Sequence, residues 1–110
     1  MTTKTLPKPP AHLRVSTKKW WKTIVEAFEL ESHHLRLLQA ACESWDRMQA
    51  ARAVLDRDGV SWTDRFGAPR ARPEVAVERD AKVSFARLVR ELNLDSAPGA
   101  DLLRPPALNR

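Results

Sequence analysis

Residues 32–58, SHHLRLLQAACESWDRMQAARAVLDRD, contain the longest regular pattern in this 110-residue sequence and decide its class of fold. The apolar residues recur every three or four positions, the spacing that places side chains on one face of an α-helix. They are Leu35, Leu38, Ala41, Cys42, Trp45, Met48, Ala51 and Leu55. Ser32 is the expected N-cap, and Gly59 is the expected stop. We therefore predict one helix of about 25 residues, nearly 40 Å long at ~1.5 Å per residue.

Two shorter helices are predicted on either side of this long one. Upstream, Ser16 or Thr17 can cap a helix that ends near residues 29–30. Its apolar face combines Trp20 or Trp21, Ile24 or Val25, and Phe28. Downstream, Pro73 suits the first position of a third helix that ends at about Asn93. The stripe of the third helix is Val77, Ala81, Phe85, Leu88 and Leu92.

The remaining segments lack a helical period. Residues 60–72 alternate β-branched or aromatic residues with polar ones, which indicates an irregular or hairpin-like loop. Residues 1–15 contain three prolines and are interpreted as an extended basic arm, and residues 95–110 as a flexible tail. We therefore predict an all-α fold in a helical domain at 16–94. Because the first connection is short, helices one and two should form a hairpin, with helix three packed across it.

Size and composition narrow the classes of function. A hydrophobic content of 43% in 110 residues supports one domain with a modest core, and leftover apolar surface favours self-association. The single cysteine, Cys42, has no partner for a disulfide or a thiolate zinc site and suits a reducing cytoplasm. The sequence shows neither a signal peptide nor a long apolar run, so no membrane association is predicted.

Catalytic and metal sites find little support in the sequence. Glu31, His33 and His34 could be mistaken for metal ligands, but adjacent residues on a helix point about 100° apart, unlike an i, i+4 pair. The alternative is a set of polar residues around a helix start. None of the phosphate-binding or nucleophile motifs is present, and Cys42 fits the apolar stripe as a small core residue. We therefore predict no catalytic residue, no cofactor and no metal.

Positive charge is concentrated near the N-terminus. Residues 1–22 contain six basic residues and no acidic one, namely Lys4, Lys8, Arg14, Lys18, Lys19 and Lys22. A second basic centre in the loop comprises Arg65, Arg70 and Arg72. Such clusters are typical of surfaces that bind a polyanion, and all nine residues are predicted to bind DNA. The alternative is a solvated surface, with the loop arginines serving only to keep the loop soluble.

Four tryptophans could stack on nucleobases or fill a core. Trp45 and one of Trp20 and Trp21 fit apolar stripes, which favours the core. Trp62 lies in the loop, where it either holds the loop against the helices or contacts a neighbouring subunit. We assign Trp62 and Phe66 to an oligomer interface.

The order of short motifs over residues 6 to about 95, with the segment RPP at 104–106, resembles the small-subunit family of phage terminases. The motifs are LPKPPAHL at 6–13, KWWK at 19–22, ELESHHLRLL at 29–38, ACESWDR at 41–47, TDRFG at 63–67, RPEVAVERD at 72–80 and FARLVRELNL at 85–94. The resemblance implies a non-catalytic DNA-packaging protein that recognises viral double-stranded DNA and assembles into a homo-oligomeric ring. It also implies a large terminase subunit as partner and the cytoplasm of an infected or lysogenic bacterium as location.

Two rival functions stay open at this point. A helical adaptor that does not bind DNA could use the same basic arm to dock an acidic protein partner. A small catalytic domain would need an ordered polar pocket, for which the sequence offers no residues.

Overall fold

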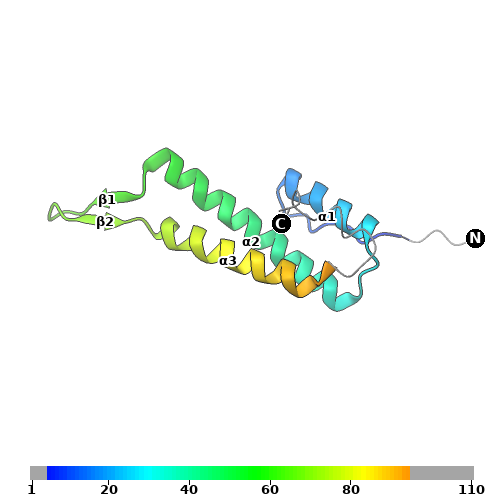
Figure 1. Cartoon of the computed structure of the whole chain (residues 1–110). Coiled ribbons are helices and arrows are strands. Elements are labelled where there is room, and N and C mark those ends of the chain that lie inside the picture. Colours follow the sequence, from blue (N-terminus) through cyan, green and yellow to red (C-terminus); the bar gives the residue numbers. More distant parts are fainter. Residues whose placement is uncertain (1–4, 95–110) are drawn as a thin grey trace, which may run out of the picture.

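The computed structural model describes residues 5–94, which form three helices and one two-stranded sheet (Figure 1). The helices are α1 at Val15–Ala27, α2 at Ser32–Asp58 and α3 at Pro73–Leu92. The strands β1, Ser61–Thr63, and β2, Pro69–Ala71, pair in antiparallel register with Trp62 opposite Arg70. The predicted all-α class is confirmed, and the predicted loop is a short β-hairpin. The tail predicted at 95–110 lies outside the described residues.

The long helical hairpin is formed by α2 and α3 and not by the first two helices (Figure 1). The predicted pairing was wrong because the β-hairpin turns the chain back directly, so that the 20 residues of α3 run along the 27 residues of α2. Helix α1 has 13 residues and covers only the end of the pair where α2 begins and α3 ends. The β-hairpin projects from the opposite end.

The core lies where all three helices meet. Ile24 of α1 and both Leu38 and Cys42 of α2 are completely buried. Leu92 and Leu94 close the same cluster from the end of α3. The predicted core position of Cys42 is confirmed, and burial, the largest cause, together with nearby Asp46 and Glu43 raises the pKa of its thiol to about 12. The thiol is therefore protonated and unreactive at neutral pH.

The predicted ends of the helices are mostly found, while the N-caps of α1 and α2 differ from the prediction. Pro73 opens α3, and Gly59 and Asn93 end α2 and α3 with positive φ angles of 85° and 53°. Helix α2 is capped by Glu31 in place of Ser32, because the Glu31 carboxylate accepts the backbone N–H of His34 in a capping box. Helix α1 begins directly after Arg14, ahead of the predicted cap at Ser16 or Thr17.

Residues 5–14 lie against the helices. The Trp21 indole Nε1 donates a hydrogen bond of 3.0 Å to the Pro7 carbonyl, and Leu13 is buried in the core. His12 Nε2 lies 2.8 Å from the Glu43 carboxylate of α2. The part of the predicted arm next to α1 therefore has a defined path, which fixes the positions of its basic residues.

The N-terminus of α1 is capped by a side chain from another helix. No side chain at Arg14 caps α1, but Asp46 of α2 accepts the Arg14 backbone N–H at 2.8 Å and the Thr17 hydroxyl. A carboxylate at a helix N-terminus satisfies free N–H groups and interacts favourably with the helix dipole. Asp46 therefore attaches the N-terminus of α1 to the long hairpin of α2 and α3.

Asp46→Ala is expected to lower the free energy of unfolding by about 1–2 kcal/mol, the usual cost of losing a helix cap and its hydrogen bonds. Urea denaturation followed by circular dichroism measures the change. Asp80→Ala is the matched control, because the exposed Asp80 pairs only with its neighbour Arg79 among residues 5–94, and this variant should stay within about 0.5 kcal/mol of the parent chain. Equal stability of the two variants would show that Asp46 does not hold α1.

Candidate nucleic-acid interface

The structure separates the predicted DNA-binding residues into two groups at opposite ends of the molecule (Figure 1). One group lies on α1 and the segment before it and is called here the α1 basic surface. It consists of Lys8, Arg14, Lys18, Lys19 and Lys22. The other group consists of the hairpin arginines Arg65, Arg70 and Arg72. Lys4 lies outside the described residues.

The α1 basic surface holds cations that have no acidic partner. Lys18 is half-buried and the other four side chains are exposed. Within residues 5–94, none of these five side chains forms an ion pair. Lys8 and Lys22 border the same shallow pocket of about 250 Å³, which also has Glu26 in its wall. The fold thus brings cations from the preceding segment and from α1 to one end of the molecule, free to meet phosphates.

The hairpin arginines are more engaged with the protein. Arg70 Nε lies 2.9 Å from the Asp64 carboxylate. Arg72 is half-buried, and its buried Nε atom has no hydrogen-bond partner in the described part of the chain. The guanidinium of Arg65 stacks 4.8 Å above the centre of the Phe66 ring. The hairpin therefore offers less free positive charge than its sequence indicates.

Asp64 organises the turn of the hairpin. Its Oδ1 atom accepts the backbone N–H groups of Phe66 at 2.9 Å and Ala68 at 3.0 Å. The hydrogen bond from Ala68, followed by that from Arg70, lowers the pKa of Asp64 below its ordinary value. Because the pKa of Asp64 is lower in the folded protein than in the unfolded chain, the ionised carboxylate stabilises the folded state. This stabilisation is complete above the unfolded pKa of Asp64 and is lost as the pH falls through its folded pKa.

In an NMR titration, the amide signals of Phe66 and Ala68 are expected to shift together as the pH falls, with a midpoint below the ordinary aspartate pKa of about 3.9. The physical reason is that both amides donate to the ionised form of Asp64. Asp64→Asn should abolish this transition, since an amide does not titrate in this range. A midpoint at or above about 3.9 would contradict the proposed role of these hydrogen bonds.

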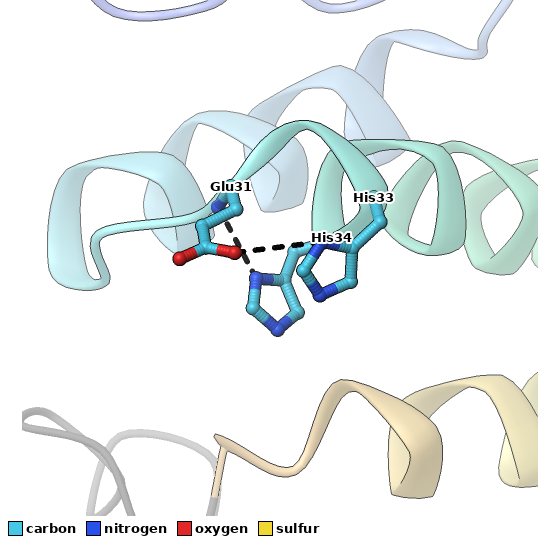
Figure 2. A group of neighbouring side chains, drawn as sticks. All are labelled: Glu31, His33 and His34. Carbon is cyan, nitrogen blue, oxygen red and sulfur yellow. Dashed lines mark hydrogen bonds and ion pairs between the residues drawn. The ribbon is translucent and has the colours of Figure 1, made fainter.

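Glu31, His33 and His34 lie closer together than their sequence spacing indicates (Figure 2). Their possible ligand atoms all lie within 4.8 Å of one another. The argument from helical spacing does not apply to Glu31, because this residue is extended and stands before the helix. The Glu31 N–H donates to His34 Nδ1 at 3.1 Å, and His33 Nδ1 lies 3.6 Å from the Glu31 carboxylate. Since the capping box already uses the Glu31 carboxylate and the His34 Nδ1 atom, the absence of a metal ion stays our prediction.

An open apolar groove lies between α1, α2 and α3, and we call it the aromatic groove. Its volume is about 490 Å³. The Phe85 ring centre lies 5.0 Å from that of Trp45 and 5.8 Å from that of Trp20. The remaining lining residues are Arg14, Ser16, Thr17 and Gln49. The predicted core position of Trp45 was wrong, since this side chain is 37% exposed, whereas Trp21 is buried. Helix α1 begins beside Asp46, which accepts hydrogen bonds from Arg14 and Thr17, and it does not extend over Trp45.

The two predicted interface residues lie on the β-hairpin, at the other end of the long helices. Trp62 is 45% exposed and Phe66 is 79% exposed. Phe66 is therefore largely in solvent, and the choice for Trp62 between holding the loop and contacting a neighbouring subunit stays a prediction. Exposed aromatic side chains of this size are typical of contacts with another molecule.

Comparisons with known proteins add evidence of another kind. The family model described as "Phage terminase, small subunit" matches residues 17–105. No curated protein and no solved structure matches the chain. Within residues 5–94, no helix is both long enough and apolar enough to cross a membrane.

Proposed function

Since this chain belongs to the phage terminase small-subunit family, its role is in phage DNA packaging, and we propose that it recognises viral double-stranded DNA through the α1 basic surface. The observation that supports this is a set of five cations at one end of the molecule, none of which pairs with an acid within residues 5–94. Cations that are not neutralised by the protein itself can replace the counterions of a DNA backbone. The hairpin arginines, of which Arg70 is paired with Asp64, contribute less to this binding.

The family associates with viral DNA and with a large terminase subunit, and its members are generally non-catalytic. We propose that this chain likewise has no catalysis of its own and acts in the cytoplasm of the bacterial host. It self-associates into a ring and recruits or regulates the large subunit, which supplies the ATPase and nuclease activities. In a ring, weak contacts from several copies act at one high effective concentration on the same DNA.

The experiment is a measurement of DNA affinity and particle mass at two or more salt concentrations, by titration and light scattering. If the five cations each contact a phosphate, the logarithm of the affinity should fall with the logarithm of salt at a slope of about −4.5. The mass of the particle should exceed that of the monomer. A chain that is indifferent to DNA at low salt would contradict the proposal and would favour the adaptor that docks an acidic protein.

A further inference from the structure

Two apolar features of the molecule stay exposed and differ in shape. The aromatic groove is concave and has the rings of Trp20, Trp45 and Phe85 in its walls. The hairpin tip, defined here as Trp62, Arg65 and Phe66, is convex and projects beyond the helices (Figure 1). Exposed aromatic residues on a protruding element and a groove lined by aromatic residues are complementary in chemistry and form.

The two features cannot meet within one chain. Helix α2 continues from Trp45 to Asp58, a distance of about 20 Å at ~1.5 Å per residue. The β-hairpin begins after that point and extends away from the groove (Figure 1). Asp64 fixes the turn through its hydrogen bonds to Phe66 and Ala68, so the hairpin tip keeps its shape. A hairpin tip can therefore reach only the groove of another molecule.

We propose that the hairpin tip of one copy inserts into the aromatic groove of a second copy, with Phe66 packed against the rings of Trp45 and Phe85. The occupant of the groove is thus a second copy of this chain. This inference rests on the self-association in the proposed function and names the surfaces that carry it. Because the contact joins two different surfaces, each added copy presents a tip and a groove for the next one.

The charges around the groove fit this occupant. Asp46 contacts Arg14 and Thr17 of the groove wall through neutral donors, a backbone N–H and a hydroxyl, so its carboxylate keeps its negative charge. The hairpin tip carries the cation of Arg65 next to Phe66. Arg65 is exposed and forms no ion pair within residues 5–94. When Phe66 enters the groove, Arg65 can approach the Asp46 carboxylate.

The aromatic groove is also large enough to hold an aromatic side chain. A volume of about 490 Å³ is within the range of about 300–1,000 Å³ that is typical of ligand sites. Gln49 and Ser16 in its wall supply polar groups at the edge. An aromatic anchor in an aromatic-lined pocket, surrounded by polar residues, is the usual arrangement of a binding hot spot.

The first test is the substitution Phe66→Ala, with the mass in solution measured by light scattering over a dilution series. Loss of a buried aromatic anchor should raise the dissociation constant of self-association about 30-fold. The variant should keep its fold, since the Phe66 side chain is largely exposed. Val83→Ala, another exposed apolar residue, on α3, is the control and should leave the mass unchanged. If Phe66→Ala also leaves it unchanged, the inference is overturned.

The second test is disulfide cross-linking between two variant chains, Arg65→Cys and Gln49→Cys, which keep Phe66 and are mixed and oxidised under mild conditions. Native Cys42 does not compete, because it is fully buried and its thiol stays protonated. A covalent heterodimer joined through the two introduced thiols, identified by mass spectrometry, is expected. The pair Arg65→Cys and Arg79→Cys, with Arg79 exposed on α3, is the control and should remain unlinked.

The outcomes separate this inference from the proposed function. A parent chain that forms oligomers and binds DNA, together with variants that do not cross-link, overturns the tip-and-groove contact and leaves the proposed function standing. A parent chain that remains monomeric at micromolar concentration overturns both the contact and the ring.

Discussion

Alanine in place of Lys18, Lys19 and Lys22 is expected to lower the affinity for double-stranded DNA by about two orders of magnitude near 0.1 M salt. The three lysines lie on α1, and none forms an ion pair within the described part of the chain. The salt slope should become less steep by about 2.7, because each lost phosphate contact removes about 0.9. Fluorescence anisotropy with a labelled duplex at several salt concentrations measures both quantities.

A matched triple variant removes the same charge elsewhere. Arg79, Lys82 and Arg87 are exposed on α3, so their replacement by alanine leaves the α1 basic surface intact. This control should keep the affinity within a few-fold of the parent chain and the salt slope unchanged. If both triple variants lose affinity equally, DNA binding depends on net charge alone and not on the α1 basic surface. Binding of the large subunit by the lysine variant would further argue against the adaptor hypothesis.

Leu38→Ala is expected to have the largest effect on stability, a loss of about 2–5 kcal/mol in the free energy of unfolding. Leu38 is completely buried in the cluster that joins α1 to the α2–α3 hairpin, so alanine leaves a cavity between all three helices. A shift in the urea midpoint with an unchanged slope would measure it. Val83→Ala, which removes two methyl groups from an exposed position, should change stability by no more than about 0.5 kcal/mol.

Local signals in the sequence predicted the elements well. The three- and four-residue spacing in 32–58 predicts α2 to its last residue, because Gly59 has the positive φ that ends the helix. Pro73 and Asn93 predict the bounds of α3 in the same way. These signals depend on residues close in sequence, and their physical causes are local.

Features that depend on distant residues were not predictable. Periodicity identifies an apolar face of α2 but not which helix covers each part of it, so Trp45 and Trp21 looked equally suited to the core. The carboxylate of Asp46 caps a helix that begins about 30 positions earlier, and no sequence spacing indicates such a contact. The pairing of Arg70 with Asp64 likewise showed only in the structure, and it weakens the second basic centre.

The continuous α2–α3 pair fixes the distance between the two ends of the molecule. Both helices run without a break from the α1 end to the β-hairpin. A residue inserted in only one of them would rotate everything beyond it by about 100° and destroy the packing of that part. The length of the α2–α3 pair can therefore change without loss of packing only by matched insertions of about seven residues, or two turns, in both helices. Each such step would move the hairpin about 10 Å farther from α1 and so alter the reach of every subunit.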